Sequence, residues 1–164
     1  MFYACNSIFE YDFCVDSLDR QILDLLQDKG RLSVSDLAER VGLSEAPTWR
    51  RVKRLEDSGV IAGYHARLDR KALSLSVFAI VSVRFSIHDL TMAETFEAAI
   101  RDLKCVQSCH NVTGDVDYIL TVVSKDLEVY EQFTRLLRGI PGVTSIQTHL
   151  SLREVKSSNR IEIG

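Results

Sequence analysis

The sequence predicts an α+β protein in which an N-terminal winged helix-turn-helix precedes a C-terminal βαββαβ domain of the ferredoxin-like type. Two observations support this fold. Apolar residues recur at helical spacing up to about residue 62, whereas from residue 76 they alternate with the period of a β-strand. The chain of 164 residues has 46% hydrophobic content, which suits two small cores. We therefore expect two domains, the second with an antiparallel sheet that carries both helices on one face.

The first helix is expected to begin at Asp16 or Ser17, either of which can cap its N-terminus. It should end near Lys29 and Gly30. Its apolar face consists of Leu18, Ile22, Leu25 and Leu26. Residues 1–15 show no clear periodicity, so we treat them as an N-terminal extension.

The next two helices have the outline of a helix-turn-helix. One is expected over Val34 to Val41. It follows Ser33 and Asp36, which have the spacing of a capping box, and Gly42 can end it. The other opens at Ser44 or a near neighbour, with Pro47 tolerated in its first turn. The residues expected to point into the core from this helix and the segment after it are Val52, Leu55, Val60 and Ile61.

The third helix is rich in cations. Its outward residues are Thr48, Arg50, Arg51, Lys53 and Arg54. Glu56 and Asp57 lie in its C-terminal half, which is the reverse of the order that the helix dipole favours. This order indicates nucleic-acid binding, and a solvated structural face is the alternative. Trp49 is either a packing residue beside Val52 or a base contact.

Charge is distributed unevenly along the chain, whose net charge is -3. Residues 31–71 contain nine cations and six acids, a local charge of +3, while residues 88–131 contain three cations and nine acids, a local charge of -6. An acidic half would be repelled by a phosphate backbone. It is therefore better suited to binding itself, a small molecule or another protein.

A linker and hinge over residues 63–75 are expected to join the helix-turn-helix domain (16–62) to the second domain (76–164). Val60 to Leu68 looks extended, like a wing or a linker strand. The elements expected after it are a strand at 76–86, a helix over Met92 to Leu103, strands at Val106–Val112 and Tyr118–Val123, a helix over Leu127 to Ile140 and a strand at 145–155. Phe78, Ile80 and Val112 would be exposed on the open face of this sheet, which predicts pairing with a second copy.

Several classes of protein are excluded. No apolar run approaches the length of a membrane span, and residues 1–15 make a poor signal peptide, so we expect a cytoplasmic protein with reduced thiols. Cys105, Cys109 and His110 lack the spacing and partners of a metal site. We expect no cofactor and no enzyme activity, because the sequence has no nucleophile elbow, phosphate loop or metal motif.

The sequence resembles the leucine-responsive regulator and asparagine-operon regulator (Lrp/AsnC) family of prokaryotic transcription factors. The resemblance covers about residues 16–163. It rests on LDRQILDLLQDKGRLS, RVKRLEDSGVIAGYHARLD, the GDVDY run at 114–118, IPGV at 140–143 and REVKSSNR near the end. One departure is SEAP at 44–47, where S-P-T-P is usual, so Glu45 places an acid near the DNA side.

The resemblance implies sequence-specific, nucleoid-associated regulation of transcription by a homo-oligomer, a dimer or an octamer, on double-stranded DNA, with an amino-acid effector. The candidate DNA-binding residues are Ser44, Glu45, Thr48, Trp49, Arg50, Arg51, Lys53 and Arg54. The candidate effector-binding residues are Thr113, Gly114, Asp115, Asp117, Leu127, His149 and Ser151. Two alternatives stay open: an amino-acid-sensing module that acts on a protein partner, and an architectural DNA-wrapping protein without an effector.

Overall fold

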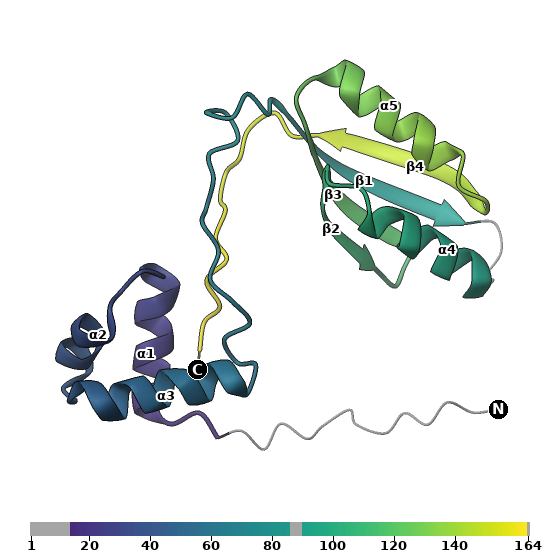
Figure 1. Cartoon of the computed structure of the whole chain (residues 1–164). Helices are drawn as coiled ribbons and strands as arrows, with labels where there is room; N and C mark the ends of the chain where they lie inside the picture. The colour runs from purple at the N-terminus through teal and green to yellow at the C-terminus, as the bar shows by residue number, and fades with distance from the viewer. Residues whose placement is uncertain (1–13, 86–89, 164) are drawn as a thin grey trace, which may run out of the picture. The chain divides into compact units, whose positions relative to one another are not determined.

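A computed structural model of the chain describes residues 14–85 and 90–163, so most of the predicted N-terminal extension lies outside the described residues. Contacts divide the chain into two units. One unit holds the chain up to Arg67 together with the C-terminal segment from Ser157, and the other spans Leu68–Lys156 (Figure 1). The predicted second domain, 76–164, therefore includes a C-terminal segment that packs with the first unit.

The first unit contains α1 (Ser17–Asp28), α2 (Val34–Val41) and α3 (Glu45–Asp57). Both predicted N-terminal caps are present. Asp16 and Asp19 form a capping box at α1, and Ser33 and Asp36 form one at α2. Gly42 ends α2 with a φ of 69°, a left-handed conformation that glycine adopts without steric cost.

The core of this unit lies between the three helices. Its buried residues are Ile22, Leu23, Leu37, Val41, Val52 and Leu55. The segment from Val60 to Leu68, expected to be extended like a wing or a linker strand, contains no strand residue. Val60, which was expected to point into the core, is exposed, as are Tyr64 and Leu68. None of the described residues of the first unit belongs to a strand with which this segment could form a ladder.

The C-terminal segment contacts α1. Gln27 donates from Nε2 to the Ile161 carbonyl (3.0 Å) and accepts at Oε1 from the Ile161 backbone N–H (2.6 Å). The Arg160 guanidinium pairs with Asp24 at 3.2 Å and Asp28 at 3.4 Å. Ile163 packs against the helical core. This segment is therefore a structural part of the first unit.

We expect removal of residues 157–164 to lower the free energy of unfolding of this unit by about 1–2 kcal/mol. The exposed ion pairs contribute little, and the hydrogen bonds and Ile163 contribute most of this value. Trp49 is the only tryptophan in the sequence and belongs to this unit, so thermal unfolding can be followed by its fluorescence. Arg160→Gln, the milder control, should have a smaller effect. An unchanged unfolding temperature in the truncated protein would contradict this expectation.

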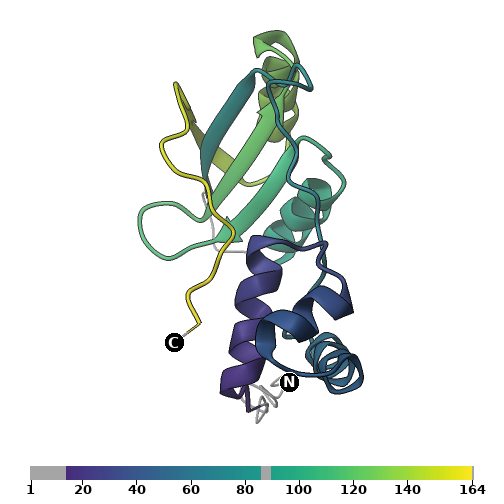
Figure 2. The same ribbon diagram turned by 90° about the vertical axis from the view of Figure 1, so that its left-hand side faces the viewer.

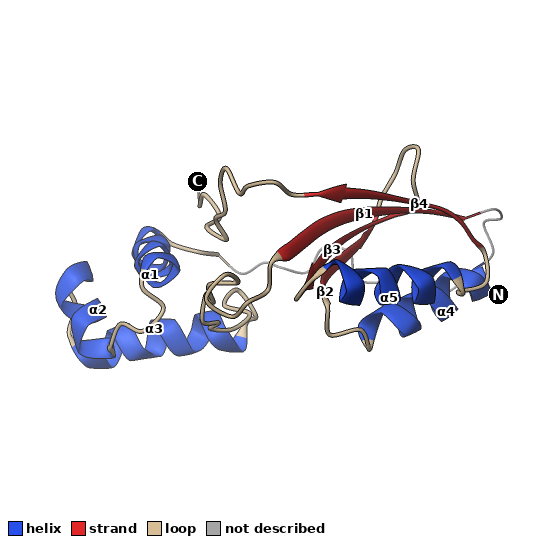
Figure 3. Cartoon of the chain, turned by 90° about the horizontal axis from the view of Figure 1, so that it is seen from above, coloured by secondary structure: helices blue, strands red, loops and turns tan. Residues whose placement is uncertain are grey.

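The second unit is a four-stranded antiparallel sheet in the order β2-β3-β1-β4. The strands are β1 (Val77–Phe85), β2 (Val106–Asn111), β3 (Tyr118–Ser124) and β4 (Val143–Leu150), and the helices are α4 (Leu90–Arg101) and α5 (Leu127–Arg138). Both helices lie on the same face of the sheet, as predicted (Figure 3). The last strand begins before the predicted 145 and ends at Leu150, not at 155. Leu152 is 99% exposed, so no core packing extends the strand.

Alternation along β1 separates the two faces of the sheet. Val77, Ala79, Val81 and Val83 are buried beneath the helices, as the period of two predicts. Their neighbours face the open side. On that side the Arg70 guanidinium lies 4.5 Å above the Phe78 ring, and Ile80 stays 42% exposed. Figure 2 shows the four strands and the hairpin that extends from the end of β2 and β3.

Candidate functional site

Four of the exposed residues of α3 form a stripe at helical spacing, and Glu45, Arg54 and Asp57 are exposed beside it. The members of this stripe are Ala46, Trp49, Arg50 and Lys53, all of them exposed. Their separation of three, four and seven positions places them along one side of the helix. The opposite side packs into the core through Val52 and Leu55. We call these four residues the exposed stripe.

Trp49 belongs to the surface of the protein. Its side chain is 54% exposed, so the interpretation of Trp49 as a packing residue is wrong. An exposed tryptophan side chain leaves apolar surface in contact with water, which is unfavourable unless a partner covers it. Its position beside Arg50 makes it a candidate contact for a ligand of α3.

Thr48 is not available to DNA. It is fully buried, and its Oγ1 donates to the Ser44 carbonyl at 2.9 Å. The prediction of an outward Thr48 is therefore wrong. Thr48 lies four positions before Val52, which places the two on the same buried face of α3.

Arg51 and Arg54 do not extend freely from α3 as predicted. Arg51 Nη1 donates to Asp16 Oδ2 at 2.6 Å and to Asp19 Oδ1 at 2.8 Å, and Arg54 Nη2 pairs with Asp19 Oδ2. The hydrogen bonds with Asp16 and Asp19 raise the pKa of Arg51. Two hydrogen bonds lower the pKa of the Asp16 carboxyl: the one from the Asp19 backbone N–H has the larger effect, and the one from Arg51 comes second. These ion pairs join α3 to the start of α1.

The other two cations of α3 do not pair with α1 in the described part of the chain. Arg50 is exposed and forms no ion pair within the described part of the chain. Lys53 pairs with Asp57 at 2.8 Å, and this exposed i,i+4 pair is weak enough to exchange for a phosphate. Ser44 is the N-cap residue, but its side chain makes no capping hydrogen bond. Glu45 is exposed in the first turn of α3.

Four of the candidate effector-binding residues lie in the hairpin between β2 and β3, where Gly114 has a φ of 120°. Thr113 and Asp115 are exposed at this hairpin. Asp117 also has a structural role, since its Oδ2 accepts from the Phe85 backbone N–H at 2.8 Å. Its own backbone N–H donates to the Val83 carbonyl at 3.0 Å. Asp117 thus fixes the end of β1 against the hairpin.

The other three effector candidates lie away from the hairpin, His149 near the middle of the sheet and the other two at its far end. His149 is opposite Ile80, the Ser151 N–H donates to the Phe78 carbonyl, and Leu127 begins α5 beyond the far end of β3. From Phe78 to the hairpin end of β1 is about 23 Å at the usual strand rise. One chain therefore does not bring the two groups together.

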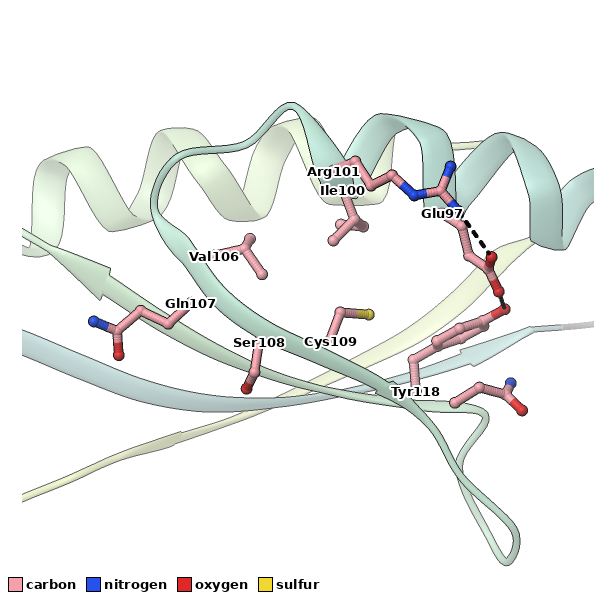
Figure 4. A pocket seen from close by; sticks show the side chains of 9 residues that line it. Glu97, Ile100, Arg101, Val106, Gln107, Ser108, Cys109 and Tyr118 are labelled. Atoms are coloured by element: carbon pink, nitrogen blue, oxygen red, sulfur yellow. Dashed lines mark hydrogen bonds and ion pairs between the residues drawn. The ribbon is translucent and has the colours of Figure 1, made fainter. Parts of the chain in front are cut away.

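A cavity of about 390 Å³, which no sequence pattern predicted, lies between α4 and β2 (Figure 4). Its lining residues are Glu97, Ile100, Arg101, Val106, Gln107, Ser108, Cys109, Asn111 and Tyr118. The Tyr118 hydroxyl donates to Glu97 at 2.9 Å. Burial is the main cause that raises the pKa of Tyr118 to about 12, and the hydrogen bond to Glu97 is the second. Asn111 also donates to the Asp117 carbonyl. Tyr118 ends the GDVDY run, which is the one signal in the sequence that points here.

Both units match family models. Residues 15–62 match a winged helix-turn-helix DNA-binding model, and residues 78–161 match the Lrp/AsnC ligand binding domain. The chain is 46% identical over 142 residues to the Bkd operon transcriptional regulator of Pseudomonas aeruginosa, covering 86% of this chain and 93% of that protein. It is 40% identical over 150 residues to the leucine-responsive regulatory protein of Escherichia coli, covering 91% and 92%.

Solved structures agree with this assignment. A transcriptional regulator from Neisseria meningitidis in complex with L-Met superposes with a TM-score of 0.87 at 33% identity, covering 91% of this chain and 97% of that one. The feast or famine regulatory protein of M. tuberculosis complexed with L-methionine gives 0.82 at 28% identity, covering 90% and 99%.

The chain belongs to the Lrp/AsnC family. Like the relatives it matches, it is a DNA-binding transcriptional regulator, and it is not an enzyme. Across residues 14–85 and 90–163, no helix has the length and apolar character needed to cross a membrane.

Proposed function

We propose that this regulator acts in the prokaryotic cytoplasm as a homodimer or larger assembly on double-stranded DNA, and that an amino acid modulates it. The exposed stripe of α3 reads the major groove. Ser44 and Glu45, at the start of α3, lie beside the DNA backbone and the first bases. Two copies joined through their sheets supply two recognition helices for a two-fold site.

The exposure of the stripe is the observation that carries the DNA-binding part of this proposal. Arg50 presents a guanidinium that can bind the two acceptors of guanine, and Lys53 can bind a phosphate. Trp49 offers an apolar surface next to them for sugar or thymine methyl contact. Arg51 and Arg54 lie on the flank of the stripe and contribute through the packing of α3.

We expect Arg50→Gln to weaken binding to a duplex selected by the parent protein from a random-sequence pool. Loss of a bidentate base contact costs about 1–3 kcal/mol, which corresponds to roughly 5- to 150-fold in affinity. Fluorescence anisotropy with the selected duplex and an unrelated duplex measures both affinity and discrimination.

Arg135→Gln is the matched control. It removes the same charge from an exposed position of α5, where Arg135 pairs with Glu131, and should leave DNA affinity unchanged. Equal binding by the parent and Arg50→Gln would exclude Arg50 from the interface. A parent protein that binds both duplexes equally would favour the architectural alternative.

The amino-acid part rests on family membership and on the complexes of the two structural relatives with L-Met. In this chain the hairpin residues Thr113, Gly114, Asp115 and Asp117 offer carboxylates and accessible backbone groups. Leu127, His149 and Ser151 of a neighbouring copy would complete the site, since they lie away from the hairpin in their own chain. Binding between copies would couple the effector to assembly.

A further inference from the structure

Asp19 lies at the centre of a cluster of four charged residues that joins α1 to α3. Its side chain is fully buried. Oδ1 accepts from Arg51 at 2.8 Å, while Oδ2 pairs with Arg54 and accepts from the Asp16 backbone N–H at 3.2 Å. Arg51 also pairs with Asp16 at 2.6 Å. The cluster contains two acids and two bases, so it is formally neutral.

The two arginines of this cluster belong to a separate side of α3. Arg51 and Arg54 recur three positions apart beside the exposed stripe, on the flank that contacts the start of α1. Each lies one position after a member of the stripe, Arg50 or Lys53. Both side chains could therefore reach a DNA backbone next to the stripe if nothing bound them.

We propose that Asp19 is a specificity-determining residue of the DNA-binding surface, because it retains Arg51 and Arg54 against α1 and withholds them from phosphates. This inference rests on the proposed function. An arginine that left the cluster for a phosphate would remove one of the two charge partners of a fully buried carboxylate, which is unfavourable. Asp19 thus reduces sequence-independent attraction to DNA and leaves recognition to the exposed stripe.

The test compares Asp19→Asn with the parent on the selected and the unrelated duplex over a series of salt concentrations. Asparagine keeps the shape of the side chain and an acceptor for the cap, but removes the charge. We expect tighter binding to the unrelated duplex at low salt, a smaller ratio between the two affinities, and a salt slope steeper by up to about two, one for each released arginine.

Asp16→Asn is the matched control. Asparagine also caps helices well, and Arg51 keeps its bond to Asp19, so the salt slope should equal that of the parent. A folded Asp19→Asn protein with the slope and the affinity ratio of the parent would overturn the inference.

Arg54→Gln decides the question if Asp19→Asn does not fold. An arginine withheld from DNA can be removed without a change in salt slope, whereas Arg50→Gln should change affinity or slope. A slope lower by about one in Arg54→Gln would show that Arg54 contacts a phosphate, and the inference would be wrong while the proposed function stands. A parent protein without salt-dependent binding would overturn both.

Discussion

Replacing Ile80 by glutamate is expected to separate the proposed homodimer into monomers. Ile80 is 42% exposed at the centre of the open face of the sheet, between Thr121 of β3 and His149 of β4. In a two-fold interface each copy would bury one new carboxylate without a partner. We expect the dissociation constant of the dimer to rise at least about 100-fold, since an unpaired buried charge costs several kcal/mol.

Light scattering of the full chain at micromolar concentration measures this change. Leu136→Glu is the matched control, because Leu136 is 47% exposed but lies on α5, in the other layer of the unit. It should keep the dimer. The Ile80→Glu monomer should also lose most of its affinity for a two-fold DNA site, since it presents a single α3. A dimeric Ile80→Glu protein would place the interface elsewhere.

Local sequence signals predicted most of the fold. The capping boxes at Asp16 and Ser33 are short-range patterns, so the starts of α1 and α2 follow from a few neighbouring residues. The alternation of Val77, Ala79, Val81 and Val83 likewise assigned the buried face of β1. These features were predictable because the interacting groups lie within a few positions of one another.

Contacts between residues far apart in the sequence, such as those of Arg51 in α3, were not predictable in this way. Arg51 and Asp19 are 32 positions apart, and Gln27 and Ile161 are 134 apart. No periodic pattern connects such positions, because the contacts depend on how the helices pack. The end of β4 was misplaced for a related reason. Leu152 continues the alternation of that strand but has no neighbouring strand or helix to cover it.

Burial was hardest to predict from the sequence for helical residues at the edge of a buried face. Adjacent positions on a helix differ by about 100°, so Thr48 and Trp49 have opposite environments although they are neighbours in the chain. The first is fully buried, whereas the second is 54% exposed. Only the packing of α3 on α1 and α2 decides where the buried face ends. The candidate DNA-binding set therefore divides into two residues at the start of α3, three members of the exposed stripe, the two arginines of the flank and one core residue.

Asp117 has a structural role in the hairpin and a proposed role in binding an amino acid, and two substitutions at this position separate the two roles. Its carboxylate accepts from the Phe85 N–H at 2.8 Å. Asparagine can preserve this bond, whereas alanine cannot, so Asp117→Ala should distort the hairpin whether or not an effector binds there. Asp117→Asn removes only the charge. If the carboxylate binds the ammonium group of an amino acid, affinity should fall about 10- to 100-fold without loss of the fold.

A thermal-shift screen of the twenty amino acids on the parent would identify the ligand, because a ligand that binds only the folded state raises the unfolding temperature. Calorimetry then compares the parent with Asp117→Asn. Asp115→Asn removes the same charge from the same hairpin, at a residue with no structural hydrogen bond among those described. It tests whether loss of any carboxylate charge in the hairpin weakens binding of the amino acid, or only loss of the charge on Asp117. If Asp117→Asn binds the amino acid as tightly as the parent does, Asp117 has only its structural role, and the ammonium must bind elsewhere. The Glu97 carboxylate in the cavity between α4 and β2 would then be the next candidate, because Asn111 links that cavity to the backbone of the same hairpin.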